Sequence, residues 1–309
     1  MAEKRKATTW IEYLLARTVL GIIGALPPSL GDRLAMALTG SLLHLLPSKR
    51  RAGMRNLQIA FPELPIEEHE RILRAAARNV GRVMATDVRM FNASPAEALD
   101  LLVYEPDEKF TSTYKKSVES GQGRILVSGH IGNWELWGFT FPLLFEPFNF
   151  LARRMDNPLI DEYFMKARTR YGNVQIDKEN SARAILSILR KGGAVAMLAD
   201  VNSHPKEGVF APFFGIDACT TSGVAMLALR ANAVIVPMWA IWDEKLGKFR
   251  LVHDEIIEPV RTGDRTADIE ATTALHVAAT ERIIRAYPDQ WTWVHRRWKT
   301  RPPGEPELY

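Results

Sequence analysis

His130 and Glu135 are the two residues of this 309-residue sequence whose types and spacing most clearly indicate chemistry. A histidine can act as a general base near neutral pH, and a carboxylate beside it can fix the tautomer of the imidazole. On one uninterrupted helix, a spacing of five residues would separate the two side chains by about 140°. Gly132 and Asn133, which lie between them, favour a turn. The two side chains can therefore meet if the backbone bends at these residues.

The elements on either side of this turn are predicted to be a strand and a helix. Residues 124–127 are typical of a buried strand. We therefore expect His130 in the turn after that strand and Glu135 in the first turn of the next helix. The N-terminus of such a helix directs backbone N–H groups toward an anion that develops nearby. From the spacing alone, a structural role for His130 is an equally good interpretation.

A second carboxylate competes with Glu135 for the role of partner to His130. Residues 194–199 are predicted to form a buried strand, and Asp200 follows that strand directly. The carboxyl ends of strands are where open α/β sheets place ligand chemistry. Either Glu135 or Asp200 can orient the imidazole on these grounds. His295 is a second candidate for the catalytic histidine, but no carboxylate lies at a comparably short spacing from it.

The composition is that of a globular protein with one large domain or two small ones. The residues are 47% hydrophobic, and the single cysteine, Cys219, excludes a disulfide within the chain. No spacing of Cys and His indicates a zinc site, and we expect no metal or other cofactor. The net charge is only +4, but basic residues cluster at 4–6, 49–51, 153–154 and 295–297. Such clusters suit anionic lipid head groups, phosphates or an acidic carrier protein, whereas no motif for reading nucleic acid accompanies them.

The first 48 residues contain two mostly apolar segments separated by Pro27 and Pro28. Charged residues interrupt both segments, so neither offers the approximately 20 apolar residues that span a bilayer. The basic clusters on both sides favour the cytoplasmic side of a membrane for both ends. We therefore expect residues 1–48 to form two helices that lie in the membrane surface, with residues 49–309 forming the catalytic domain. The alternative is that these are ordinary core helices of a soluble domain.

Several stretches of the sequence resemble one family of bacterial enzymes. Residues 129–135 resemble the His-x4-acid block of the bacterial lipid A biosynthesis acyltransferases, the late lauroyl and myristoyl transferases of the lysophospholipid acyltransferase superfamily. The resemblance runs from about Arg50 to Pro302, and the other matching blocks are residues 54–64, 151–158, 200–202, 208–215 and 287–299. It implies an α/β fold with a mixed, largely parallel sheet flanked by helices. It also implies an N-terminal membrane-associated helical segment at the cytoplasmic face of the bacterial inner membrane.

The resemblance further implies a reaction and a set of partners. The reaction is transfer of an acyl chain from a thioester of acyl carrier protein or CoA to a hydroxyl group of a lipid A precursor in the membrane. His130 would be the general base, with Glu135 or Asp200 as its partner, and an anionic phospholipid surface would hold the enzyme. Arg153 aligns with a family arginine, and its guanidinium group suits a phosphate oxygen. The other predicted substrate-binding residues are Arg154, Asn157, Asn133, Phe213, Phe214 and Gly215.

The sequence departs from the family at two of these blocks, and other functions therefore stay open. Val201 stands where the family usually has Gln, and Arg154 stands where it often has Pro. One alternative is an acyltransferase for another lipid or glycolipid. A second is a thioesterase that uses the same His–acid pair, and a third is a non-catalytic membrane scaffold. The Trp-rich residues 287–299 are interpreted either as part of the core or as an amphipathic surface. The aromatic residues 134–150 suit the core, an acyl-chain groove or both.

Overall fold

The computed structural model describes residues 2–105, 107–152, 155–176 and 181–309. In chain order the elements are α1 (Ala2–Ala25), α2 (Pro28–Leu45), α3 (Pro47–Ala60), α4 (Ile66–Asn92), α5 (Pro95–Asp100), β1 (Leu102–Val103), α6 (Glu108–Glu119), β2 (Arg124–Ser128), α7 (Trp134–Leu144), β3 (Asn149–Phe150), α8 (Pro158–Arg168), β4 (Val174–Gln175), α9 (Ser181–Arg190), β5 (Ala194–Leu198), β6 (Gly208–Phe213), β7 (Ile216–Thr221), α10 (Gly223–Ala231), β8 (Val234–Asp243), β9 (Lys248–His253), α11 (Arg265–Ala286) and the 3-10 helix η1 (Pro288–Gln290).

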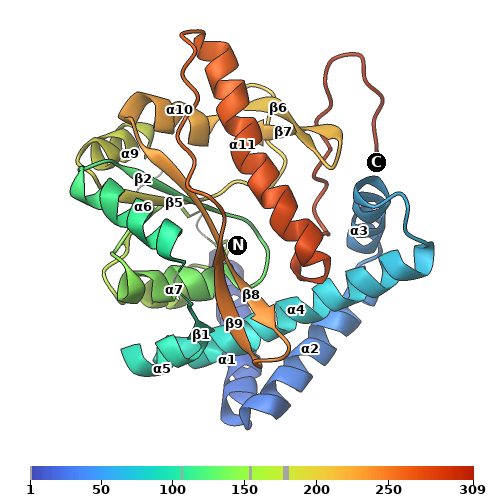
Figure 1. Ribbon diagram of the computed structural model, residues 1–309. Coiled ribbons are helices and arrows are strands. Elements are labelled where there is room, and N and C mark those ends of the chain that lie inside the picture. The colour runs from blue at the N-terminus through green and yellow to red at the C-terminus, as the bar shows by residue number, and fades with distance from the viewer. Residues whose placement is uncertain (1, 106, 153–154, 177–180) are drawn as a thin grey trace.

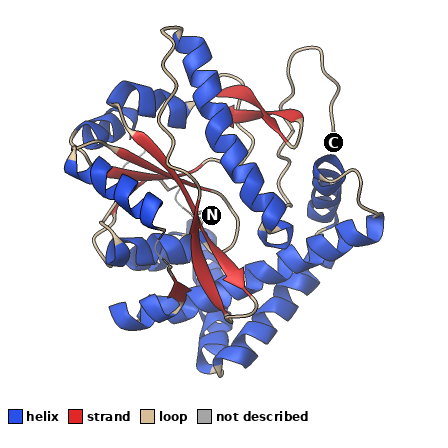
Figure 2. Cartoon of the chain, in the orientation of Figure 1, coloured by secondary structure: helices blue, strands red, loops and turns tan. Residues whose placement is uncertain are grey.

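The main sheet has the strand order β1-β9-β8-β2-β5-β3-β4 (Figures 1 and 2). Neighbouring strands run parallel except β8 and β9, which form an antiparallel pair. Strand β2 therefore lies in the interior of the sheet, between β8 and β5. The predicted mixed, largely parallel sheet is confirmed.

Helices cover both faces of this sheet (Figure 1). The side chains of β2 alternate between the faces, as the pleat of a strand requires. Ile125 and Val127 pack among residues of α9 and α10 on one face, whereas Leu126 packs among residues of α6 and α7 on the other. Because both faces are buried, β2 is apolar throughout its centre, which is the pattern that made it recognisable as a strand.

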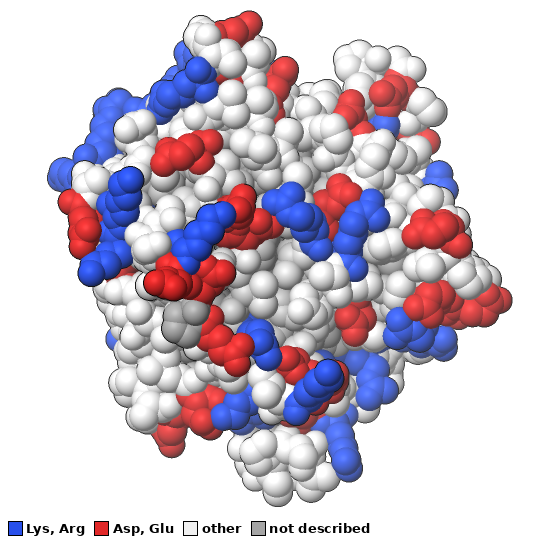
Figure 3. Space-filling model, viewed as in Figure 1, with Lys and Arg blue, Asp and Glu red and all other residues white. Residues whose placement is uncertain are grey.

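The N-terminal segment forms the two predicted helices, α1 and α2, which pack against α4. Pro28 is the first residue of α2, where its missing N–H group costs nothing. Both helices also leave large apolar side chains exposed: Trp10, Ile11, Leu14, Leu15, Ile22, Leu30, Leu38, Leu42 and Leu45. Figure 3 shows charged side chains of both signs over most of one face and an uncharged tip at the bottom, where α1 turns into α2.

None of the described helices combines the length and the apolar character that crossing a bilayer requires.

A two-stranded hairpin, β6–β7, accounts for one of the blocks that the sequence analysis assigned to substrate binding. Phe214 and Gly215 form its two-residue turn, with φ values of 53° and 75°. Two consecutive positive φ values are typical of the type I′ turn that suits a tight hairpin. Phe213 and Phe214 are both buried and pack with Trp291, Trp293 and Trp298. These two rings are therefore part of the protein core.

The turn after β2 depends on one glycine. Gly132 has a φ of 59°, and a Cβ atom there would lie 1.9 Å from the carbonyl oxygen of Ala240. Its own N–H group donates to the carbonyl oxygen of Gln290 at 3.0 Å, and the next N–H group, of Asn133, donates to Ala240 at 2.8 Å. Only glycine combines the positive φ with this close approach of two backbone segments.

We predict that Gly132→Ala destabilises the protein far more than Gly215→Ala does. Both glycines have a positive φ, and this alone costs an alanine about 1–2 kcal/mol. A Cβ atom at Gly215 meets no atom within 4 Å, so only Gly132→Ala adds a backbone clash. Urea denaturation of the two variants measures the difference in the free energy of unfolding. Equal losses of stability would contradict this role of Gly132.

Candidate active site

The site begins at the carboxyl ends of two neighbouring parallel strands, β2 and β5. In the register of this pair, Ser128 is opposite Leu198. The N–H group of Ala199 continues the ladder by donating to the carbonyl oxygen of Ser128 at 3.1 Å. His130 and Asp200 each lie two residues beyond the paired positions, so the sheet places them side by side at the same edge. This is the edge where open α/β sheets bind ligands.

The buried carboxylate of Asp200 takes part in three hydrogen bonds, two with His130 and one with Trp291. Its Oδ1 atom lies 2.9 Å from Nδ1 of His130, and its Oδ2 atom accepts from the His130 backbone N–H group at 2.8 Å. The indole N–H group of Trp291 donates to the same Oδ2 atom at 2.8 Å. Gly129 permits this approach, because a Cβ atom there would lie 2.9 Å from Cγ of Asp200.

The electrostatics of the pair stabilise the imidazolium ion that forms when His130 takes up a proton, and they fix the tautomer of the neutral ring. Burial disfavours the charged form of each side chain, but the attraction between His130 and Asp200 outweighs this effect for both. The pKa of His130 is raised above its ordinary value by the adjacent Asp200, although burial of the imidazole works in the opposite direction. The pKa of Asp200 is lowered well below its ordinary value, because His130 and Trp291 outweigh the burial of the carboxylate. Since ionised Asp200 accepts from Nδ1–H, the proton of neutral His130 stays on Nδ1.

Glu135 contacts a different partner. It lies in the first turn of α7, as predicted, and its two carboxylate oxygens accept from Nε and Nη2 of Arg168 at 2.9 and 2.5 Å. Of the two carboxylates that the sequence analysis considered, Asp200 is the one that contacts the imidazole. Of the two alternatives, the one in which Glu135 contacts the imidazole is not the arrangement found, because the start of α7 directs the Glu135 side chain to the last turn of α8.

A buried network lies behind this ion pair and supports the start of α7. The Asn133 side chain caps the helix by accepting from the N–H group of Leu136 at 2.8 Å. Its Nδ2 atom donates to Oδ1 of Asp87 at 3.2 Å. Burial, together with the nearby charge of Glu135, raises the pKa of Asp87 well above its ordinary value. The buried environment of Asp87 therefore favours the uncharged form of its carboxyl group, and Asn133 connects that group to the start of α7.

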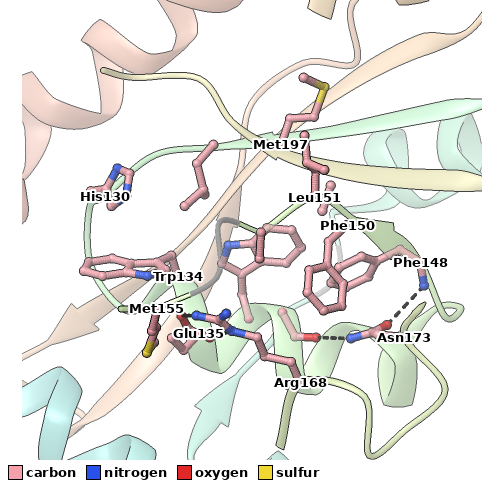
Figure 4. Close-up of a pocket in the computed structure, with 15 residues that line it drawn as sticks. His130, Trp134, Glu135, Phe148, Phe150, Leu151, Met155, Arg168, Asn173 and Met197 are labelled. Carbon is pink, nitrogen blue, oxygen red and sulfur yellow. Dashed lines mark hydrogen bonds and ion pairs between the residues drawn. The ribbon is translucent and has the colours of Figure 1, made fainter. Parts of the chain in front are cut away.

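A cavity of about 310 Å³ opens beside His130 (Figure 4). Its polar part is formed by His130 and by the ion pair between Glu135 and Arg168. Its apolar part includes the rings of Phe148 and Phe150. The remaining lining residues are Trp134, Trp137, Gly138, Leu151, Ala152, Met155, Asn173, Ala196, Met197 and Leu198. An apolar cavity with a few polar groups at one end suits a hydrocarbon chain that carries a reactive polar group.

Most of the other predicted substrate-binding residues lie away from this cavity. Asn157 caps α8 and donates to the carbonyl oxygen of Thr9 at 2.8 Å and to Glu12 at 3.1 Å, and so attaches α1 to α8. Asn133, Phe213, Phe214 and Gly215 do not line the cavity either. They cap a helix or form the β6–β7 hairpin and its turn, and their contact with substrate stays a prediction. Arg153 and Arg154 lie outside the residues that the structure describes.

The Trp-rich segment forms part of the core. Trp291, Trp293 and Trp298 are completely buried. His295, the second candidate for the catalytic histidine, places Nδ1 2.6 Å from the carbonyl oxygen of Thr292, and burial lowers its pKa. The core interpretation of residues 287–299 therefore holds for the three indole rings. Among the described residues, no group of three or more His, Cys, Asp or Glu side chains is arranged to hold a metal ion.

Two residues of the site escaped the sequence analysis. Asp87 lies near the C-terminal end of α4, where an acid beside Ala85, Thr86 and Val88 is the signal that was available. Arg168 gave no such signal. Arg168 is one of several basic residues in its segment, and its pairing with Glu135 depends on the packing of α7 against α8.

The sequence matches one family of proteins over most of its length. The model of the family described as bacterial lipid A biosynthesis acyltransferase matches residues 2–300, which extends farther toward the N-terminus than the resemblance noted above. The chain is 28% identical to the lipid A biosynthesis lauroyltransferase of Escherichia coli strain K12 over 303 residues, covering 97% of the chain and 95% of that relative. The palmitoleoyltransferase of the same strain is 28% identical over 272 residues, covering 84% and 83%. Its myristoyltransferase is 21% identical over 306 residues, covering 97% and 90%.

We predict that Asp200→Asn lowers the pKa of His130 because it removes the carboxylate that stabilises the imidazolium ion. In the unaltered protein this pKa should lie above the ordinary value of 6.5. NMR titration of the His130 ring measures both values. Glu135→Gln is the matched control and should shift the pKa less, because Glu135 is already neutralised by Arg168 and acts on His130 without a contact. A larger shift in Glu135→Gln would show that Glu135 is the effective partner.

Proposed function

The chain belongs to the family of bacterial lipid A biosynthesis acyltransferases, and we propose that it transfers a fatty acyl chain from a thioester to a hydroxyl group of a lipid A precursor. The observation that carries this proposal is the position of the His130–Asp200 pair beside an apolar cavity of about 310 Å³. The cavity would hold the acyl chain, and His130 would meet the thioester carbonyl at its polar end. Acyl carrier protein is the proposed donor, with CoA as the alternative.

His130 acts as the general base in the proposed reaction. Its Nε2 atom takes the proton of the acceptor hydroxyl as the oxygen attacks the thioester carbonyl and a C–O bond forms. Asp200 stabilises the resulting imidazolium ion. When the tetrahedral intermediate collapses, the C–S bond breaks and the imidazolium ion returns the proton to the leaving thiolate. The products are the acylated lipid and the free thiol of the donor.

The start of α7 supports the same step electrostatically. Backbone N–H groups at a helix N-terminus stabilise the oxyanion of the tetrahedral intermediate, and α7 begins four residues after His130. No acyl-enzyme is proposed. The two side chains that would otherwise be candidate nucleophiles, Ser128 and Cys219, are completely buried. Direct transfer between the two substrates follows.

The enzyme is proposed to act at the cytoplasmic face of the bacterial inner membrane. The exposed apolar residues of α1 recur at helical spacing, with Trp10 above Leu14 and Ile11 above Leu15. Two helices with such faces can lie in the plane of a membrane without crossing it. The acceptor lipid would then reach the site laterally from the bilayer. The contacts of Asn157 with α1 connect this surface to α8, which carries Arg168.

The proposed activity is tested by supplying the purified protein with labelled acyl carrier protein thioesters. Lauroyl, myristoyl and palmitoyl donors are each combined with a tetraacylated lipid A precursor or with a lysophospholipid. We predict His130-dependent product on the lipid A precursor, with a loss of at least about 100-fold in His130→Ala because the general base is removed. The matched control His204→Ala changes an exposed histidine and should retain activity.

Three results of this assay would contradict the proposal. Product on the lysophospholipid alone would mean that the acceptor is a lysophospholipid and not a lipid A precursor. Free fatty acid formed at the same rate with and without acceptor would indicate a thioesterase. Undiminished product formation by His130→Ala would show that His130 is not the general base.

Membrane binding is tested by flotation with vesicles that contain phosphatidylglycerol. We predict that replacing Leu14 and Leu15 by Glu shifts the protein from the floating to the soluble fraction, because each exposed leucine contributes about 1.5–3 kcal/mol when it is buried in lipid. A matched control replaces the exposed Val174 and Leu246, which lie outside α1 and α2. If both double variants float equally well, α1 is not the membrane-binding surface.

A further inference from the structure

A second cavity, of about 480 Å³, lies next to the site but is separate from the apolar cavity. Three segments form its walls: the first turn of α3, the residues after β5 and the C-terminal segment. Val201, which follows Asp200 directly, belongs to its wall, so the cavity begins one residue from the partner of His130. The other lining residues are Ser48, Lys49, Ala52, Asn202, Val294, His295, Arg296 and Lys299.

The cavity is strongly basic. Lys49, Arg296 and Lys299 line it, and none of its lining residues within the described chain is Asp or Glu. No ion pair involves these three cations among the described residues, whereas the neighbouring Arg50 pairs with Glu70 and Arg301 pairs with Glu305. The three cations are exposed around one concavity, and their combined positive potential attracts an anion to it.

The backbone adds to this positive potential. Helix α3 begins with Pro47, and its N-cap residue Leu46 supplies no side-chain hydrogen bond. The N–H groups of Ser48 and Lys49 belong to the first turn, where no partner exists within the helix. Both residues line the cavity, so the positive end of the helix dipole coincides with the lysine and arginine side chains.

His295 also lines the cavity and carries a ring nitrogen that is unsatisfied within the described chain. Because Nδ1 of this ring lies 2.6 Å from the carbonyl oxygen of Thr292, Nδ1 carries the proton and Nε2 is an acceptor. The Nε2 atom is buried and has no hydrogen-bond partner among the described residues. A group that brings both an anion and hydroxyl donors would satisfy the cations and this ring together, and a phosphorylated sugar is such a group.

The position of the cavity indicates that the ligand comes from the membrane. Leu42, Leu45 and Leu46 are exposed and directly precede the first turn of α3. The basic cavity therefore lies at the end of the apolar face of α2. A lipid whose chains contact these leucines would carry its polar head group to the level of Lys49.

We propose that this cavity binds the phosphate group of the glycolipid acceptor and so positions the acceptor hydroxyl beside His130. The proposal rests on the proposed acyl transfer and assigns the acceptor to a separate cavity from the acyl chain of the donor. Lys49, Arg296 and Lys299 contact the phosphate, together with the first backbone N–H groups of α3. These residues position the substrate and take no part in proton transfer.

Binding is measured in the His130→Ala background, so that no turnover occurs. Titration calorimetry in detergent compares a tetraacylated lipid A precursor with the same lipid after phosphatase treatment. Replacing Lys49 and Lys299 by Gln should weaken binding of the phosphorylated lipid about 10-fold to 100-fold, because charge-assisted hydrogen bonds are lost. The affinity for the dephosphorylated lipid should not change. The matched control replaces Lys191 and Lys245 by Gln, which alters the net charge equally outside the cavity.

Three results would overturn the proposal. One is an equal loss of affinity for both lipids, and another is no loss for either. The third is a steady-state result with active enzyme, in which the variant raises the KM for the acyl carrier protein thioester and leaves the KM for the acceptor unchanged. In that case the cavity serves the phosphopantetheine of the donor. If the unaltered enzyme forms no acylated lipid although the binding results hold, acyl transfer is the claim that fails.

Discussion

The hydrogen bonds of the Asp200 carboxylate are the interaction on which the site depends. A buried carboxylate is stable only if its oxygens are satisfied, and here three donors converge on it from His130 and Trp291. The same contacts fix the backbone of His130, the tautomer of its ring and the position of the C-terminal segment. Gly129 and Gly132 belong to this arrangement because each leaves room for a group that a side chain would displace.

The sequence analysis predicted the local parts of this site better than its long-range contacts. Residues 124–135 were correctly interpreted as a strand, a turn and a helix start, and Asp200 was correctly placed at the end of a strand. The choice between Glu135 and Asp200 required the knowledge that β2 and β5 are neighbours with Ser128 opposite Leu198, which no local pattern contains. The aromatic ring of Phe213 was assigned to a substrate pocket because apolar character is the same in a pocket and in a core.

The proposed reaction uses separate parts of the protein for the acyl chain of the donor, the phosphate of the acceptor and the membrane. The apolar cavity with Phe148 and Phe150 suits the acyl chain of the donor, and the basic cavity at the start of α3 suits the phosphate of the acceptor. The exposed apolar faces of α1 and α2 suit the proposed attachment to a membrane. His130 lines the apolar cavity, Asp200 directly precedes a residue of the basic cavity, and about a third (32%) of the His130 side chain is exposed.

The most direct test of this account is a crystal structure with a stable thioether analogue of the acyl-pantetheine donor. We expect the acyl chain in the cavity beside Phe148 and Phe150. The carbon that replaces the thioester carbonyl carbon should lie near Nε2 of His130, with room between them for a hydroxyl oxygen about 3–3.5 Å from that carbon. An acyl chain bound along the exposed faces of α1 and α2, with His130 still paired to Asp200 but remote from the reactive group, would contradict the account.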